Sequence, residues 1–164
     1  RDTTAFTKLR ALEPYYHQNP WSAALAGKKV LVAIFRDTIL RQYARREQLF
    51  PGTDILPEFA DLTVVRAVQG LAGRDTGLHL VDALAAMERQ MDAADYEVVV
   101  IGAGAYGLPL AAHARDTGHT AIQMSGATQL LFGIRGKRWD AHPVISGCIT
   151  DAWVRPAENE ASPT

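Results

Sequence analysis

A run of β-branched residues that leads into three glycines constrains the fold of this chain more than any other feature. Residues 97–101 are mostly valine and isoleucine, and Gly102, Gly104 and Gly107 follow with the spacing G-x-G-x-x-G. A helix-like stretch then covers about residues 108–117. Glycines at a strand-to-helix turn let the backbone bend sharply and approach a ligand closely, and the start of the helix offers free N–H groups to an anion. The sequence therefore predicts a phosphorylated ligand at this turn.

Apolar runs alternate with amphipathic stretches along the rest of the chain. The predicted strands cover residues 28–35, 62–68, 97–101 and 119–124, and the predicted helices cover residues 38–50, 79–92, 108–117 and 127–132. Strands that alternate with helices indicate a mainly parallel sheet with helices on both faces. We therefore predict an α/β fold, a Rossmann-like three-layer domain with a mainly parallel sheet at 28–155. An N-terminal arm at 1–27 precedes it and a flexible tail at 156–164 follows it.

Two of the predicted helices make specific predictions about burial. In the 79–92 helix the spacing places one apolar set on a single buried face, namely Leu80, Leu84, Met87 and Met91. In the 38–50 helix, which we expect to end at Pro51, Gln42 and Arg46 are spaced i, i+4 and share one face. We expect that face to be turned to solvent; the alternative is that it points toward the ligand site.

Composition excludes several classes of protein. The chain has 164 residues, of which 48% are hydrophobic, and a net charge of −1, as expected for one globular domain without bulk attraction to nucleic acid. No apolar run approaches the roughly 20 residues of a membrane span, and no signal-peptide pattern occurs, so we expect a cytoplasmic protein. Cys148 is alone and the five histidines are scattered, so we predict no metal site from them and a buried structural role for the thiol.

A basic loop follows the fourth predicted strand. Residues 133–140 contain Arg135, Lys137 and Arg138 together with two glycines. Arginine offers a planar fork to phosphate or carboxylate, and lysine adds a point charge. Trp139 could stack on a base or a sugar. The alternative is a solvated basic loop in which Trp139 is anchored in the core, and the sequence leaves both interpretations open.

Ligands of doubly wound sheets bind beyond the carboxyl ends of the strands, so the loops after Phe35, Ile101 and Met124 are predicted to converge on one site. A dinucleotide-binding site also requires an acidic residue at the end of the next strand, to bind the ribose hydroxyls. Residues 122–125 contain neither Asp nor Glu, which argues against an NAD-dependent dehydrogenase. The Asp-x-Glu at 95–97 has the spacing used by some metal-dependent sugar transferases, but it lies at the amino end of its strand. We interpret it as structural.

Several segments together carry a resemblance to a known family. They are residues 20–22, 27–32, 42–43, 49–51, 55–59, 67–69, 101–107, 129–139 and 153–156, and they include the motifs IGAGAYG and LLFGIRGKRW. Over most of residues 14–160 the chain resembles a group of largely uncharacterised bacterial proteins of the kind found with surface-glycan genes. That group is loosely similar to the D-type glycosyltransferase fold, whose members bind a nucleotide-sugar on a Rossmann-like sheet.

The resemblance implies a glycosyltransferase-like domain whose ligand is a nucleotide-sugar or another phosphorylated small molecule. Enzymes of that fold commonly carry an Asp-x-Glu metal motif near the N-terminus, which the start of this chain lacks. A divalent metal, Mn²⁺ or Mg²⁺, is therefore expected only if upstream carboxylates exist. The chain begins at Arg1 rather than Met, which is compatible with a piece of a longer protein.

On this hypothesis each candidate residue has a role. The glycine turn presents its backbone to the diphosphate through Gly102, Gly104, Tyr106 and Gly107. The basic loop, which also contains Trp139, neutralises the charge of the diphosphate through Arg135, Lys137 and Arg138. Gly126 and Gln129 line the sugar side. Asp140 is the one nearby carboxylate that could act as a base. The alternatives are a non-catalytic nucleotide-binding or assembly module, and a Rossmann-type oxidoreductase or methyltransferase. A homodimer through the N-terminal arm is compatible with the sequence.

Overall fold

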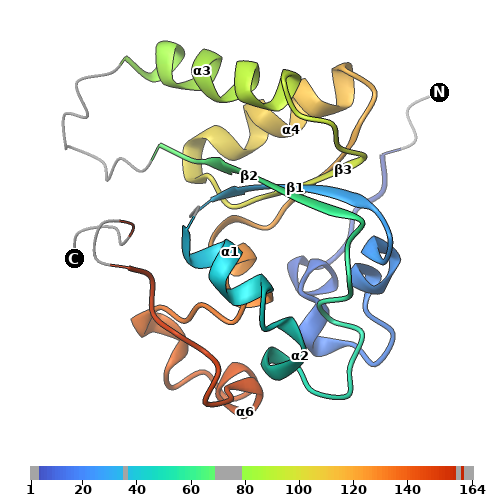
Figure 1. Cartoon of the computed structure of the whole chain (residues 1–164), viewed down its shortest axis with the longest axis vertical. Helices are drawn as coiled ribbons and strands as arrows, with labels where there is room; N and C mark the ends of the chain where they lie inside the picture. Colours follow the sequence, from blue (N-terminus) through green and yellow to red (C-terminus); the bar gives the residue numbers. More distant parts are fainter. Residues whose placement is uncertain (1–3, 35–36, 69–78, 158–159, 161–164) are drawn as a thin grey trace.

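A four-stranded parallel sheet forms the centre of the computed structural model, which describes residues 4–34, 37–68, 79–157 and 160 (Figure 1). The strands are β1 (Lys29–Ile34), β2 (Asp61–Arg66), β3 (Val98–Ile101) and β4 (Thr120–Gln123). Their order across the sheet is β2-β1-β3-β4, and all neighbouring pairs are parallel. The predicted α/β fold with three layers and a parallel sheet is confirmed.

Two helices cover one face of the sheet, above it in Figure 1: α3 (Leu80–Asp92) and α4 (Gly107–Asp116). They pack on inward-facing strand residues such as Leu31 and Val99, both fully buried. Met87 and Met91 are buried as the helical spacing predicts, and Leu84 packs against the same cluster. Leu80 is 61% exposed, so its predicted burial is wrong. It is the first residue of α3 and lies before the part of the helix that rests on the sheet.

The opposite face is covered by several short elements. The α-helices there are α1 (Asp37–Tyr43), α2 (Arg46–Leu49), α5 (Thr128–Leu131) and α6 (Ile145–Cys148). The 3₁₀ turns of the chain are η1 (Leu9–Leu12), η2 (Pro14–Tyr16), η3 (Trp21–Leu25), η4 (Gly104–Tyr106), η5 (Ser125–Ala127) and η6 (Lys137–Trp139). A second apolar cluster joins this layer to the sheet through Val30 and Val32.

The helix predicted over 38–50 is broken into α1 and α2, which corrects the sequence-based prediction. Gln42 is fully buried and does not face solvent, because its Nε2 donates to the carbonyl oxygens of Gly133 and Ala152, both at 3.1 Å. Its Oε1 accepts a hydrogen bond from Arg45 Nε at 2.8 Å, where the first helix has already ended. The break also lets Leu49 turn into the core, where it is fully buried.

The N-terminal arm packs on the body of the domain rather than extending from it. Tyr15 is 7% exposed, and its hydroxyl donates to the carbonyl oxygen of Ala127 at 2.9 Å. Burial raises the pKa of Tyr15, so this hydroxyl remains a donor. Trp21 Nε1 in turn donates to the Leu12 carbonyl at 3.0 Å and closes the arm on itself. Within the described part of the chain, no helix combines the length and apolarity that a bilayer crossing requires.

Candidate functional site

Three strands end side by side at one edge of the sheet, which we call the carboxyl edge. Ala33 of β1 pairs with Ile101 of β3, and Ile101 pairs with Gln123 of β4. The backbone continues this contact beyond the strands, because Gly102 N donates to the Ala33 carbonyl at 2.9 Å and Met124 N donates to the Ile101 carbonyl at 3.0 Å. The turns after β3 and β4 therefore begin side by side next to the end of β1, as predicted for those two loops. Phe35 lies outside the described residues.

The three glycines of the turn after β3 are required for different reasons. A Cβ on Gly102 would lie 2.7 Å from Ile34 Cδ1 and 2.9 Å from the Ser125 carbonyl oxygen, so this residue has no room for a side chain. A Cβ on Gly107 would lie 2.0 Å from Gln123 Nε2. Gly104 has a φ of +55° and open space where a Cβ would point. Gly104 is thus the glycine that leaves room for a ligand.

The helix that follows this turn begins without a side-chain cap. Tyr106 occupies the N-cap position of α4 and makes no side-chain hydrogen bond to the helix, and no acidic residue lies in the first turn. Tyr106 itself is half-buried and packs against the apolar cluster of the α3–α4 face. The 3₁₀ turn η4 leads directly into α4, so Tyr106 N and Gly107 N already donate to the carbonyls of Ala103 and Gly104, and Pro109 has no N–H. The positive end of the helix dipole still lies at this turn. The turn is therefore suited to an anion.

The turn after β4 is held by a glutamine that the sequence reasoning missed. Gln123 Oε1 accepts from Ser125 N at 3.0 Å, and its Nε2 donates to Ser125 Oγ at 3.2 Å. Ser125 has a φ of +51° and is the one non-glycine residue with positive φ in the described ranges. Gln123 thus joins the strained turn to Gly107 of the neighbouring turn. Its position at a strand end, next to a glycine-rich turn, is the signal that could have found it.

Gly126 and Arg138 meet although they come from different segments. A Cβ on Gly126 would lie 1.8 Å from Arg138 Nη2, so the guanidinium rests directly on the glycine backbone. The same guanidinium lies 4.6 Å from the centre of the Trp139 ring. Since glycine alone permits this approach, the structure brings together two residues that the sequence predicted for one site.

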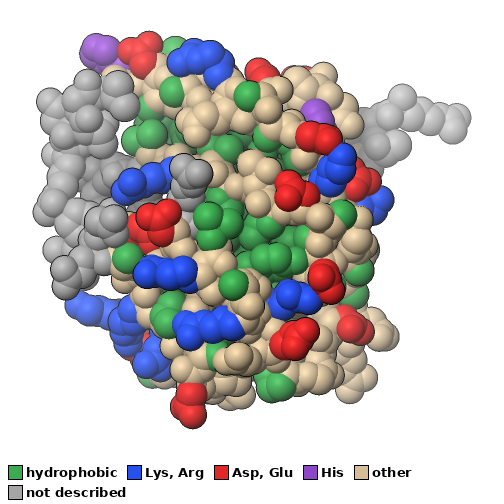
Figure 2. Space-filling model, in the orientation of Figure 1, with side chains coloured by type: hydrophobic (Ala, Val, Ile, Leu, Met, Phe, Trp, Pro, Cys, Tyr) green, Lys and Arg blue, Asp and Glu red, His purple; other side chains and the backbone are tan. Residues whose placement is uncertain are grey.

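The basic loop carries cations that have no carboxylate partner. Among the residues that the structure describes, none forms an ion pair with Arg135, Lys137 or Arg138. Lys137 and Arg138 are exposed, whereas Arg135 is half-buried and its Nε has no hydrogen-bond partner. Figure 2 shows basic side chains predominating on the left of the molecule, the side toward which the strands run, while acidic and basic groups alternate on the right.

Trp139 and Gln129 support the loop from inside. Trp139 is half-buried, packs against the core, and leaves a buried Nε1 without a hydrogen-bond partner. Gln129 is 9% exposed, and its Nε2 would lie 3.1 Å from a Cβ on Gly136. Both side chains therefore brace the basic loop, and Arg138 offers the more accessible polar surface to a ligand.

Asp140 is held by an ion pair. Arg155 Nη2 lies 2.6 Å from Asp140 Oδ2, and both side chains are partly exposed. The adjoining chain is fixed as well, because Arg135 N donates to the Val154 carbonyl at 2.8 Å. The carboxylate that the sequence proposed as a base is thus neutralised by a neighbouring cation.

Glu160 is a further residue that the sequence did not mark. It lies in the predicted flexible tail, yet it is 6% exposed and accepts hydrogen bonds from Asp37 N at 2.8 Å, Thr38 N at 3.3 Å and Thr38 Oγ1. Burial raises its pKa, but these hydrogen bonds and the nearby Arg41 guanidinium outweigh burial, so the pKa of Glu160 lies below its ordinary value. No local pattern identifies this carboxylate, because its partners are 122 and 123 residues away.

The amino edge of the sheet, opposite the carboxyl edge, holds the Asp-x-Glu motif. Asp95 Oδ2 lies 2.5 Å from Lys29 Nζ, and Glu97 Oε1 lies 2.8 Å from Lys28 Nζ. The hydrogen bond from Lys28 lowers the pKa of Glu97. The predicted position of this motif at the amino end of its strand is confirmed.

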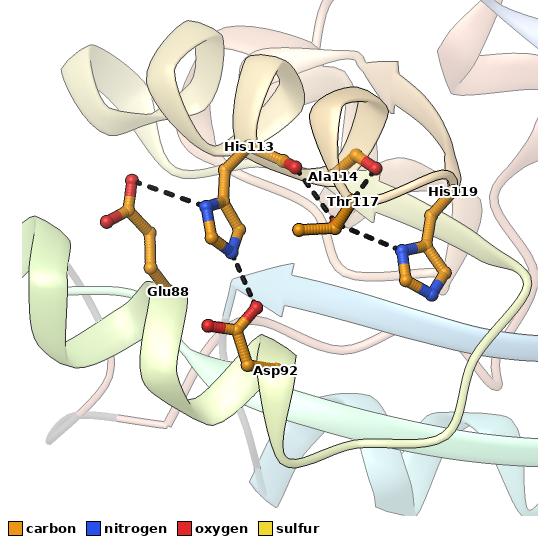
Figure 3. Close-up of polar contacts among 6 residues, drawn as sticks. All are labelled: Glu88, Asp92, His113, Ala114, Thr117 and His119. Atoms are coloured by element: carbon orange, nitrogen blue, oxygen red, sulfur yellow. Dashed lines mark hydrogen bonds and ion pairs between the residues drawn. The ribbon is translucent and has the colours of Figure 1, made fainter.

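His142 contacts the candidate site, because its ring centre lies 5.8 Å from that of Trp139. Figure 3 shows His113 of α4 between two carboxylates of α3, with Nε2 2.7 Å from Asp92 Oδ1 and Nδ1 4.0 Å from Glu88 Oε1. Cys148 is half-buried rather than buried, and desolvation raises its pKa. In the described portion of the chain, no group of three His, Cys, Asp or Glu side chains is arranged to hold a metal ion.

Comparison with protein-family models, with curated proteins and with solved structures gave no match.

Proposed function

We propose that this chain is a glycosyltransferase-like domain that binds a nucleotide-sugar, or a related phosphorylated ligand, at the carboxyl edge of β3 and β4. One observation carries the proposal. The guanidinium of Arg138 lies on the bare backbone of Gly126, next to an uncapped glycine turn, and no described carboxylate pairs with it. An unpaired arginine beside the positive end of a helix dipole matches the needs of a phosphate.

Two groups of residues bind different phosphates of the proposed ligand. The open backbone at Gly104 and the start of α4 receive one phosphate, and Arg138 with Lys137 receives the other. In a transfer reaction these cations would also stabilise the nucleoside diphosphate as negative charge develops on the leaving group. Gln123 lies where a dinucleotide-binding fold carries an acidic residue that binds the ribose. Its side chain is hydrogen-bonded to Ser125. An NAD-binding site is therefore the less favoured hypothesis.

A divalent metal does not fit the donors at this edge. Asp140 is paired with Arg155, and no three His, Cys, Asp or Glu side chains of the described residues are grouped so as to hold an ion. We therefore derive no step through a metal. The ion pair on Asp140 also favours a second candidate, a non-catalytic module that binds the same phosphorylated ligand without turnover.

Arg138→Ala tests the proposal. Calorimetry or thermal shift against nucleotide-sugars, nucleoside diphosphates, NAD(P) and S-adenosylmethionine identifies the ligand, because a ligand of the folded state raises the melting temperature. Loss of a charged hydrogen bond should then weaken binding by roughly tenfold or more. Arg115→Ala is the matched control, since Arg115 is exposed and already paired with Asp116.

Unchanged affinity in Arg138→Ala would overturn the proposed site. Turnover of the bound nucleotide-sugar by the purified chain would separate the transferase from the non-catalytic module, because the second makes no product.

A further inference from the structure

The anion bound at the end of β1 is a side chain of the protein itself, the carboxylate of Glu160. The carboxylate of Glu160 accepts hydrogen bonds from the two amides that begin α1, Asp37 N and Thr38 N, and from the Thr38 hydroxyl. Ala157 N also donates to Thr38 Oγ1 at 3.4 Å, and Arg41 Nη2 donates to the same oxygen at 3.1 Å. Glu160 is 6% exposed and Thr38 is 1% exposed. The donors at this strand end are therefore in use.

This internal carboxylate is bound just after β1, the strand that neighbours β3 of the candidate ligand site. β1 is hydrogen-bonded to β3, and the Gly102 amide of the glycine turn donates to Ala33 of β1 at 2.9 Å. Neighbouring strands are about 4.8 Å apart, so β4 ends on the order of 10 Å from β1. That separation slightly exceeds the Debye length at physiological salt, about 8 Å, but a buried charge such as Glu160 is screened much less than an exposed one. A charge at the end of β1 is thus felt at the ends of β3 and β4.

We propose that Glu160 gives the ligand site a fixed polarity, which keeps the phosphate groups of the ligand at β3 and β4 and away from β1. At the end of β1 the amides of Asp37 and Thr38 are occupied by a carboxylate that lies near the Arg41 guanidinium, whereas at the end of β4 Arg138 and Lys137 have no described carboxylate partner. This inference rests on the proposed function. It assigns an orientation: the charged part of the ligand lies toward Arg138, and its uncharged part lies toward Thr38.

Glu160→Gln tests this polarity with uridine diphosphate as the probe. The substitution removes the negative charge and keeps the size of the side chain. Removing one charge on the order of 10 Å from a phosphate should tighten binding roughly three- to tenfold at low salt, and the gain should shrink at high salt. A purely structural role would loosen binding instead.

Glu97→Gln is the matched control. It changes the net charge by the same amount and also removes a hydrogen-bonded carboxylate, but it lies at the opposite edge, paired with Lys28. Its affinity for the probe should equal that of the parent chain. An equal gain in both variants, or no gain in Glu160→Gln, would overturn the inference.

A measurement on the unmodified chain covers the case in which Glu160→Gln fails to fold. Titration with uridine diphosphate, followed by amide chemical shifts, should move the Gly104 and Gly126 amides and leave those of Asp37 and Thr38 in place. Shifts centred on Asp37 and Thr38 would overturn the polarity. If uridine diphosphate binds but the amide shifts do not follow this pattern, the inference about Glu160 is wrong and the proposed function stands. If neither the parent chain nor Glu160→Gln binds, both the proposed function and the inference are wrong.

Discussion

The two edges of the sheet carry the same kind of cation in opposite states. At the amino edge Lys28 and Lys29 are each held by a carboxylate, at 2.8 Å and 2.5 Å. At the carboxyl edge Lys137 and Arg138 have no carboxylate partner among the described residues. A cation that is already neutralised does little for a ligand, whereas unpaired cations close together repel one another until an anion arrives. The pairing of basic residues, rather than their number, distinguishes the two edges.

The same comparison explains why the Asp-x-Glu motif is a poor guide in this chain. Its two carboxylates, those of Asp95 and Glu97, are paired with Lys29 and Lys28 at the start of β1. Exposed pairs of this kind contribute little to stability, and salt screens them. They fix the charge of the amino edge near zero and leave the carboxyl edge as the region where a charged ligand is expected.

The largest effect should come from disrupting the carboxyl edge itself with Gly102→Ala. The new Cβ would lie 2.9 Å from both the Ser125 carbonyl oxygen and Thr128 Cβ, and neither can move without shifting the turn. We expect a loss of about 1–3 kcal/mol in the free energy of unfolding, measured with urea. Gly147→Ala is the control, because open space surrounds that position. Equal stability of the two variants would show that the turn is not tightly packed.

Gly126→Ala should separate affinity from stability. Its Cβ would lie 1.8 Å from Arg138 Nη2, but a guanidinium at the end of a flexible side chain can swing away. We expect the melting temperature to change little and phosphate-ligand affinity to fall roughly tenfold, as for a lost charged hydrogen bond. Adding Arg138→Ala should cause no further loss, since both changes remove one interaction. Additive losses measured by calorimetry would contradict the contact.

Glu160 should make stability depend on pH at the carboxyl edge. Its pKa is lower in the folded chain than in the unfolded chain, where the ordinary value is near 4.5. The contribution is therefore complete above that value and is lost as the pH falls through the folded-state pKa. Urea unfolding should show a stability difference between the parent chain and Glu160→Gln at neutral pH that disappears in acid. A difference that persists in acid would assign the effect to packing.

The smallest effect is expected at the amino edge. Lys28→Ala removes one partner of Glu97, and the exposed pair should leave both the melting temperature and ligand affinity nearly unchanged. A clear loss of ligand affinity would break the contrast between the edges. Thermal shift with the same nucleotide panel measures both quantities.

The fold could be predicted because its signals are local. The strands and the glycine turn each occupy one short stretch, and the order of elements requires parallel pairing. The sequence also named Gly126 and Arg138 as candidates for one site, although it could not show that one rests on the other. Gln42 was wrongly predicted to face solvent and Glu160 was missed, because the environments of both are built from distant segments. A buried amide or carboxylate side chain depends on hydrogen-bond partners from distant parts of the chain. The sequence pattern around the residue does not reveal these partners.

The amide of Gln42 has a consequence for the order in which the molecule is assembled. It joins three parts of the chain, since its acceptors Gly133 and Ala152 lie 91 and 110 residues further on. Contacts of such long range form slowly, because a large loop must close first. The layer of α3 and α4 is built from nearer neighbours in sequence. We therefore expect that side to form early during synthesis, and the side that holds the basic loop to close last.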